Sequence, residues 1–166
     1  MGQRACALES LALKKFWSGK RVLLTGHTGF KGSWLSLWLH TMGAEVFGCS
    51  LEPEDTPSLF EQLGLANKIH HKIGVVCDAD TLAKYVKDTK ADFVFHLAAQ
   101  SLVLRSYKNT LSTWNTNIMG TAHLLEALRK SGHPCAVVVV TTDKVYQNNE
   151  CGHAYLETDR LGGLDP

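Results

Sequence analysis

The sequence lacks the features of a membrane protein or of a secreted, disulfide-rich protein. Its longest apolar run is residues 136–140, whereas a transmembrane helix needs about 20 apolar residues. The N-terminus has no basic start followed by an apolar block, so a signal peptide is not indicated. The five cysteines are widely spaced and form no C-x-x-C pair, which predicts free thiols in a cytoplasmic protein.

The sequence has neither a strong net charge nor a pattern of residues typical of a metal site. The 17 basic and 16 acidic residues leave a net charge of +1, which provides no strong field for nucleic acid or a membrane surface. His70 and His71 are adjacent, and adjacent residues on a strand face opposite ways. We therefore expect neither a nucleic-acid partner nor a metal site.

Short apolar runs alternate with helical patterns along the chain, and this order predicts an α/β fold. Residues 1–15 are interpreted as an amphipathic or disordered leader and 16–166 as one domain, with Trp34, Trp38 and Trp114 in its core. Right-handed crossovers between the runs predict a doubly wound parallel sheet with helices on both faces. The expected strands are 21–25, 44–50, 69–77, 92–96 and 136–142, the last one buried, and the expected helices are 29–41, 58–65, 80–89 (capped by Asp80) and 107–130.

A glycine-rich loop follows the first expected strand and opens the first expected helix. Gly26 permits a tight turn, Gly29 lets the backbone approach a pyrophosphate, and Gly32 lets the helix pack closely on the strand. The pyrophosphate would lie against free N–H groups at the positive end of the helix. A triphosphate-binding loop is not indicated, because Lys31 precedes Gly32 instead of following it.

The end of the second strand does not decide between NAD and NADP. NAD-binding folds usually carry an acid there, about 20 residues beyond the glycine loop. The chain has Cys49, Ser50, Leu51 and Glu52 in this region, with no acid squarely at the strand end and no arginine for a 2′-phosphate.

Several blocks together resemble the extended short-chain dehydrogenase/reductase family, and within it the CDP-glucose 4,6-dehydratases. The resemblance covers residues 16–166, nearly the whole chain. It implies a Rossmann-like sheet of which the sequence holds about five strands, without the substrate lobe. The most discriminating blocks are Gly26-His-Thr-Gly-Phe-Lys-Gly32 and Thr142-Asp-Lys-Val-Tyr146, supported by Phe95-His-Leu-Ala-Ala-Gln100 and Leu161-Gly-Gly-Leu-Asp-Pro166.

The resemblance implies NAD as cofactor and a homodimer formed through the helices that include residues 107–130. His27 and Lys31 are expected near the pyrophosphate, and the small Ala98 and Ala99 near the nicotinamide ribose. Val75 departs from the family, which has an aspartate near the adenine. The full implied cofactor set is Gly26, His27, Thr28, Gly29, Phe30, Lys31, Gly32, Ser50, Val76, Leu97, Ala98, Ala99 and Gln100.

The implied reaction converts CDP-glucose to CDP-4-keto-6-deoxyglucose. It proceeds by oxidation at C4, loss of water across C5 and C6, and return of the hydride to C6. Thr142 would lie beside the substrate hydroxyl, and Asp143 would protonate the leaving hydroxyl from a buried, apolar site. Lys144 would take the C5 proton or stabilise the enolate.

The family's catalytic Tyr-x-x-x-Lys motif would begin just beyond Pro166. Neither Tyr146 nor Tyr155 is followed by a lysine four residues later, so we expect a fragment without turnover of its own. Two alternatives remain open: a non-catalytic NAD-binding module, and another sugar-nucleotide epimerase or dehydratase.

Overall fold

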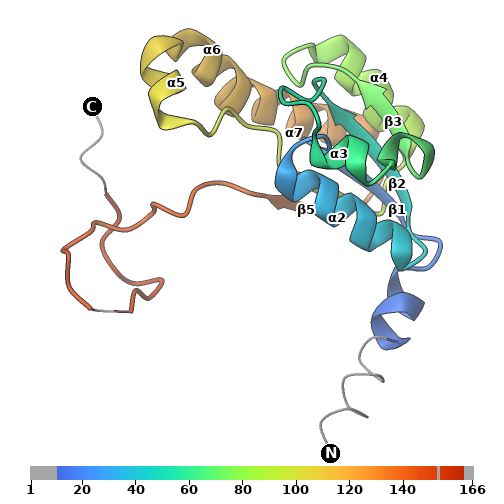
Figure 1. Ribbon diagram of the computed structural model, residues 1–166, viewed down its shortest axis with the longest axis horizontal. Helices are drawn as coiled ribbons and strands as arrows, with labels where there is room; N and C mark the ends of the chain where they lie inside the picture. Colours follow the sequence, from blue (N-terminus) through green and yellow to red (C-terminus); the bar gives the residue numbers. More distant parts are fainter. Residues whose placement is uncertain (1–10, 153, 163–166) are drawn as a thin grey trace, which may run out of the picture.

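The computed structural model describes residues 11–152 and 154–162 and shows a parallel sheet of five strands between two layers of helices (Figure 1). The strand order is β3-β2-β1-β4-β5, and every pairing is parallel. This doubly wound arrangement confirms the expected Rossmann-like fold. The strands are β1 (Arg21–Thr25), β2 (Glu45–Ser50), β3 (His70–Ile73), β4 (Phe93–His96) and β5 (Ala136–Val139).

Helices cover both faces of the sheet. Helices α2 and α3 lie on one face and α4 and α7 on the other, while α5 and α6 project away from the sheet (Figure 1). Residues 11–17, which overlap the end of the segment interpreted as a leader, are also helical. The helical elements are α2 (Phe30–Thr41), α3 (Leu59–Gln62), the 3₁₀ turn η1 (Leu65–Asn67), α4 (Ala79–Thr89), α5 (Val103–Lys108), α6 (Thr110–Trp114), the π-helical turn η2 (Asn115–Met119) and α7 (Gly120–Ser131).

Two hydrophobic cores follow from the alternation of side chains along the central strand. Val22 and Leu24 of β1 pack with Leu39 of α2 on one face of the sheet. Leu23, between them, packs on the other face with Leu82 of α4 and Leu124 of α7. All of these side chains are at most 1% exposed, so β1 is the buried centre around which both layers are built.

Several element boundaries differ from those expected. The third strand ends at Ile73 instead of residue 77, and α4 is capped by Asp78, whose carboxylate accepts a hydrogen bond from the Thr81 amide, instead of by Asp80. The helical stretch expected at 107–130 begins at Val103 and breaks at Asn109. It then passes through η2 before α7.

The three tryptophans assigned to the core are on the surface. Trp34, Trp38 and Trp114 are 50%, 57% and 61% exposed. The inner face of α2 instead carries small residues, including Gly32, Ser33 and Ser36, and this allows the helix to lie close to the sheet. On the outer side of α2, Trp34 and Trp38 line an open hollow of about 360 Å³ together with Phe30.

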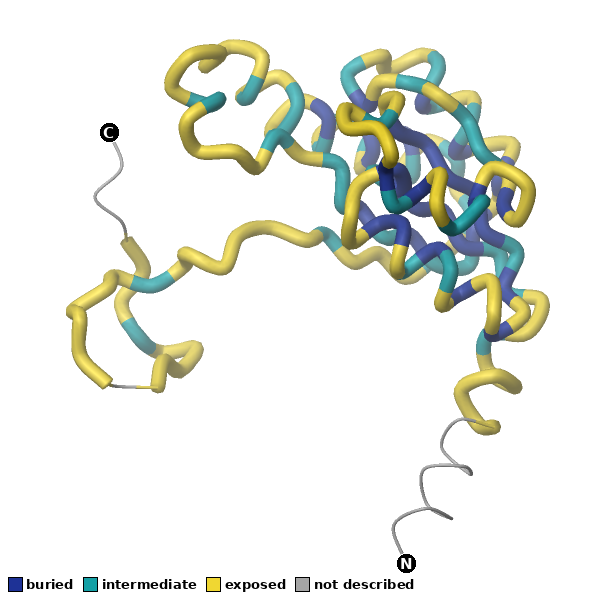
Figure 2. The backbone as a smooth tube through the Cα atoms, in the orientation of Figure 1, coloured by how far each residue is buried: buried dark blue, intermediate teal, exposed yellow. Residues whose placement is uncertain are grey.

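The valine-rich fifth strand is not buried as expected. β5 lies at the edge of the sheet, and Val138 is 48% exposed. The chain beyond it leads away from the sheet as an extended segment whose residues are almost all exposed (Figure 2). This segment folds back on itself through a bridge between Tyr146 and Leu161.

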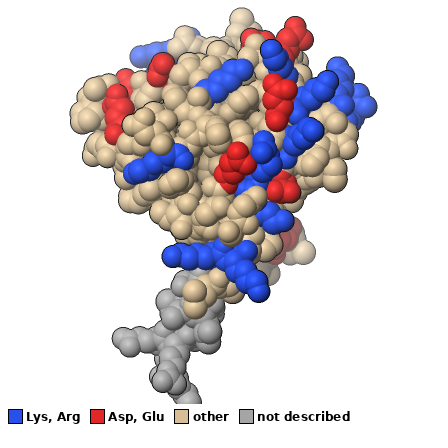
Figure 3. Space-filling model, turned by 90° about the vertical axis from the view of Figure 1, so that its right-hand side faces the viewer, with Lys and Arg blue, Asp and Glu red and all other residues tan. Residues whose placement is uncertain are grey.

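Charges are mixed over the surface. On the face shown in Figure 3, basic and acidic side chains are interspersed without a continuous patch of one sign. Among the described residues, no group of three or more His, Cys, Asp and Glu side chains is arranged to hold a metal ion. No helix in the same part of the chain is long and apolar enough to span a membrane.

Candidate cofactor-binding site

The glycine loop lies at the carboxyl ends of the central strands, where open α/β sheets bind their ligands. Gly26 has a φ of +75°, and a Cβ there would lie 2.8 Å from the Ala98 amide nitrogen. A Cβ at Gly32 would lie 2.0 Å from the Gly26 carbonyl oxygen. Both positions therefore exclude any side chain, and the loop is held against β4 on one side and α2 on the other.

The amino end of α2 has no side-chain cap. Its N-cap is Gly29, which makes no capping hydrogen bond, and its first turn contains no acid. By contrast, α3 and α4 are capped by the side chains of Ser58 and Asp78. The first-turn N–H groups of α2 and the exposed Lys31 consequently suit an anion, as the sequence pattern predicts.

Thr28 links the glycine loop to the end of β2. Its hydroxyl is 2.8 Å from the Ser50 hydroxyl and donates a hydrogen bond to the Leu51 carbonyl oxygen at 2.8 Å. Thr28 and Ser50 are both buried. The place where related folds carry a ribose-binding acid is thus occupied by a hydroxyl pair that fixes the loop.

His27 is oriented differently from the expectation that placed it beside the pyrophosphate. Its side chain is fully buried beneath the loop, and its Nε2 lies 2.8 Å from Nδ1 of His71 on β3. Burial, and secondarily the neighbouring His71, lowers the pKa of His27 to about 4. The ring is therefore neutral near pH 7, and any contact of this residue with a pyrophosphate is through its backbone.

A second buried histidine ties the loop to the opposite side of the crevice. Nδ1 of His96, at the end of β4, is 2.7 Å from the Thr25 hydroxyl, and its Nε2 is 2.9 Å from the Thr121 hydroxyl of α7. Thr25 in turn accepts a hydrogen bond from the Ala98 amide. Burial lowers the pKa of His96 as well, so the network is neutral at pH 7.

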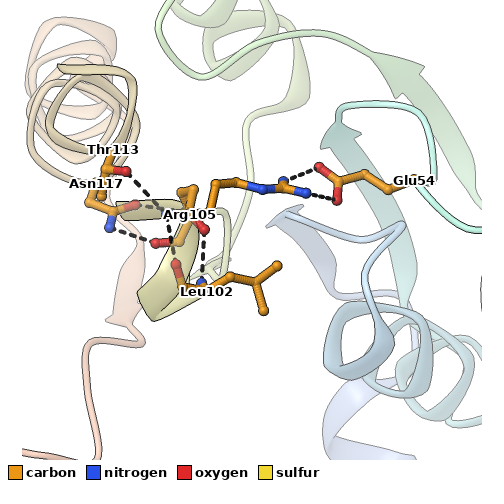
Figure 4. A network of polar contacts seen from close by, with 6 residues as sticks. Glu54, Leu102, Arg105, Thr113 and Asn117 are labelled. Carbon is orange, nitrogen blue, oxygen red and sulfur yellow. Dashed lines mark hydrogen bonds and ion pairs between the residues drawn. The ribbon is translucent and has the colours of Figure 1, made fainter. Parts of the chain in front are cut away.

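The loop after His96 is fixed by an asparagine from η2. The side chain of Asn117 accepts a hydrogen bond from the Gln100 amide at 2.7 Å and donates one to the Gln100 carbonyl at 3.0 Å. The Gln100 side chain donates to the Thr113 hydroxyl and accepts from the Leu102 amide (Figure 4). Both hydrogen bonds of Asn117 thus hold the backbone of Gln100, one of the expected cofactor residues.

An ion pair connects helix α5 with the loop after β2. The guanidinium of Arg105 in α5 donates two hydrogen bonds to the carboxylate of Glu54, which lies in the loop after β2 (Figure 4). The hydrogen bond from Arg105 holds the pKa of Glu54 below its usual value. No local sequence pattern predicts this contact, because the two residues are 51 positions apart.

The remaining expected cofactor residues divide between the core and the surface. Val76 is 4% exposed, and a Cβ added to Gly120 of α7 would meet its side chain at 2.6 Å. Leu97 is partly buried and packs against the α2 side of the sheet. Ala99 and Phe30 are exposed at the crevice end of the sheet, and Phe30 is 71% exposed.

The expected catalytic residues follow β5 and are not enclosed. Thr142, Asp143 and Lys144 are all exposed, and the Lys144 amide donates a hydrogen bond to the Thr142 hydroxyl at 3.1 Å. The buried, apolar surroundings expected for Asp143 are therefore not provided by the described residues.

Comparison with protein-family models matches residues 23–163 to the GDP-mannose 4,6-dehydratase family. The chain is also 49% identical over 153 residues to the CDP-glucose 4,6-dehydratase of Salmonella typhimurium, covering 92% of this chain and 43% of the relative. The chain belongs to the nucleotide-sugar 4,6-dehydratase family. A GDP-mannose 4,6-dehydratase of Vibrio cholerae is a more distant member, 32% identical over 77% of the chain and 34% of its own length.

Solved structures of nucleotide-sugar enzymes share the dehydratase fold. A UDP-glucose 4-epimerase from Stenotrophomonas maltophila, determined with bound NAD, superimposes with a TM-score of 0.71 at 25% identity. The match covers 86% of this chain and 43% of the epimerase. The chain thus spans less than half the length of the proteins it matches, and the part it matches contains the glycine loop.

The buried, neutral His27 predicts that the fold is less stable in acid. Its pKa is about 4 in the folded chain against an ordinary value of 6.5, so the unfolded chain binds the proton first as the pH falls. Stability is then complete above pH 6.5 and declines toward pH 4, by about 3 kcal/mol from His27. Urea denaturation at pH 7.5 and pH 4 measures the change. The His27→Gln variant should show a smaller decline, and an equal decline would contradict this assignment.

Proposed function

We propose that the chain binds NAD and forms the cofactor-binding half of a CDP-glucose 4,6-dehydratase. The observation that carries the proposal is the glycine loop, where backbone contacts at Gly26 and Gly32 leave no room for side chains and the amino end of α2 is free of caps. The NAD bound by the Stenotrophomonas epimerase, which has the same fold, supports the choice of cofactor. NAD would supply the hydride acceptor for oxidation of the sugar.

A cytoplasmic location is part of the proposal. The described cysteines Cys49, Cys77, Cys135 and Cys151 are all free thiols. Free thiols are typical of proteins kept in a reducing compartment.

Binding of NAD to the 166-residue chain tests the cofactor assignment. We expect saturable binding in calorimetry, with NADP as the competing ligand and circular dichroism to verify folding. The Gly26→Ala variant should lose binding, because the added Cβ would collide with the backbone at Ala98. The matched control is Gly152→Ala, whose Cβ would meet nothing within 4 Å. Absence of binding by the folded wild-type chain would refute the assignment.

The proposed substrate is CDP-glucose, and the product is CDP-4-keto-6-deoxyglucose. The support is the 49% identity to an enzyme named for this substrate. We assign Thr142 to the substrate hydroxyl, Asp143 to protonation of the leaving hydroxyl at C6, and Lys144 to the C5 proton or the enolate. These groups need further chain to exclude water from them, since all three are exposed.

A chimaera of residues 1–166 and the C-terminal part of the Salmonella relative tests the substrate and the roles of these residues. We expect it to form the 4-keto-6-deoxy product from CDP-glucose and to leave UDP-glucose unchanged. Asp143→Asn should lower the rate about 10²- to 10⁴-fold, the usual contribution of a general acid. Asn149→Ala, on the same segment, should not change it. Epimerisation of UDP-glucose would instead favour the epimerase alternative.

We further propose that two copies of the chain associate through α5 and α6. These helices project from the sheet and expose large apolar side chains, which in monomeric proteins are rarely so concentrated (Figure 1). The residues are Leu104 and Tyr107 of α5, Leu111 and Trp114 of α6, and Ile118 of the adjoining η2, each at least 50% exposed. Helical faces of this kind are typically covered by the same face of a second copy in symmetric dimers.

Sedimentation velocity measures this association. We expect the wild-type chain to sediment as a dimer and Leu111→Glu to sediment as a monomer, because the charge would be buried in the interface. Leu156→Glu is the control, since Leu156 is similarly apolar and exposed but lies in the C-terminal segment. A monomeric wild-type chain would rule the dimer out.

A further inference from the structure

The ring of His27 occupies a space that the neighbouring strand leaves open for it. Gly48 lies on β2 beneath the ring, and a Cβ there would stand 2.5 Å from the imidazole. Any other residue at Gly48 would therefore displace His27 and the loop that carries it. The edge of Phe60 in α3, with ring centroids 5.3 Å apart, closes the same space from above.

Across Gly48 the His27 ring reaches the edge strand of the sheet. Gly48 and His71 are register partners in the β2–β3 pairing, so the ring spans one strand to meet the next. The hydrogen bond between Nε2 of His27 and Nδ1 of His71 is 2.8 Å long. His70, the preceding residue, lies on the opposite face of the sheet, where its ring stacks on Phe47.

The backbone of the same residue is fixed as well. The Ser33 hydroxyl of α2 donates a hydrogen bond to the His27 carbonyl, and the Gly26 amide donates to the Cys49 carbonyl of β2. The loop is thus joined to α2 and β2 through its backbone, whereas its connection to β3 depends on one side chain. Backbone N–H groups of such a loop are the groups that bind a pyrophosphate. The contact of the His27 side chain with β3 therefore bears on the direction in which these N–H groups point.

We propose that His27 is a positioning residue for the cofactor, which through its hydrogen bond to His71 holds the glycine loop in the conformation that binds the pyrophosphate. The inference rests on the proposed NAD binding and extends it to a residue on β3 that is remote from the loop in sequence. His71 then influences cofactor affinity without touching the cofactor.

The His71→Phe variant removes the hydrogen bond and retains a ring against Phe60. We expect NAD affinity to fall about tenfold, the upper range for loss of one buried hydrogen bond. His71→Asn, whose amide can replace Nδ1, should restore affinity to within about twofold of wild type. His70→Phe is the matched control and should bind NAD like the wild-type chain, because it changes the adjacent histidine on the other face.

Hydrogen exchange of the amides at residues 26–30, measured without cofactor, tests the positioning role separately from binding. We expect faster exchange in His71→Phe than in wild type, and no change in His70→Phe. If circular dichroism shows that His71→Phe is unfolded, His71→Gln is measured instead. The glutamine amide lies one bond farther from the backbone than Nδ1, so this variant keeps a polar side chain but misplaces the hydrogen-bonding group.

The outcomes separate this inference from the proposed function. Wild-type affinity in His71→Phe, or an equal loss in His70→Phe, would overturn the positioning role while leaving NAD binding intact. If the wild-type chain does not bind NAD, the proposed function fails. In that case, faster exchange of the loop amides in His71→Phe would show that the hydrogen bond between His27 and His71 stabilises the loop but has no role in cofactor binding.

Discussion

The close approach of backbone to backbone around Gly26 and Gly32 is the constraint on which the rest of the site depends. A side chain at Gly32 would be driven into the Gly26 carbonyl oxygen, and one at Gly26 into the amide of Ala98. These contacts place the start of α2, the end of β1 and the chain after β4 within van der Waals distance. Three backbones thus meet at the carboxyl ends of the strands without side chains between them, at the place where open α/β sheets bind their ligands.

Two buried histidines stabilise this arrangement from opposite sides. His27 extends toward β3 and His96 toward α7, and each forms a hydrogen bond through an imidazole nitrogen. Burying a charged imidazole would be costly, and accordingly burial lowers the pKa of both. The loop is consequently supported by neutral hydrogen bonds, and the uncapped positive end of α2 and the exposed Lys31 are the nearby features that suit an anion.

The sequence predicted the strands and the glycine loop well, because both are encoded locally. A buried parallel strand is a short apolar run, and the loop requires glycine at fixed positions. The burial of Trp34 and Trp38 was predicted wrongly. Their spacing of four shows that they share one face of α2, but it does not show whether that face is turned toward the sheet or toward solvent. Small residues such as Gly32 and Ser36 form the buried face instead, since close packing on the sheet needs small side chains.

Other features could not be predicted because they depend on distant partners. The apolar character of β5 suggested that the strand is buried. A parallel strand is buried only when helices cover both of its faces. β5 instead lies at the edge of the sheet. The hydrogen bonds of Arg105 to Glu54 and of His27 to His71 join residues far apart in sequence. Their formation follows from the strand order 3-2-1-4-5, which becomes known only with the fold.

The proposed cofactor site and the proposed catalytic residues therefore lie in separate parts of this chain. Among the described residues, the contacts that shape the glycine loop lie between β1 and α7. Thr142, Asp143 and Lys144 come after the edge strand and are exposed, whereas acid–base chemistry on a sugar requires these groups to be shielded from water and aligned with the substrate. The proposed NAD site thus depends on contacts within the described fold, while the proposed reaction requires a second layer of protein over the end of β5.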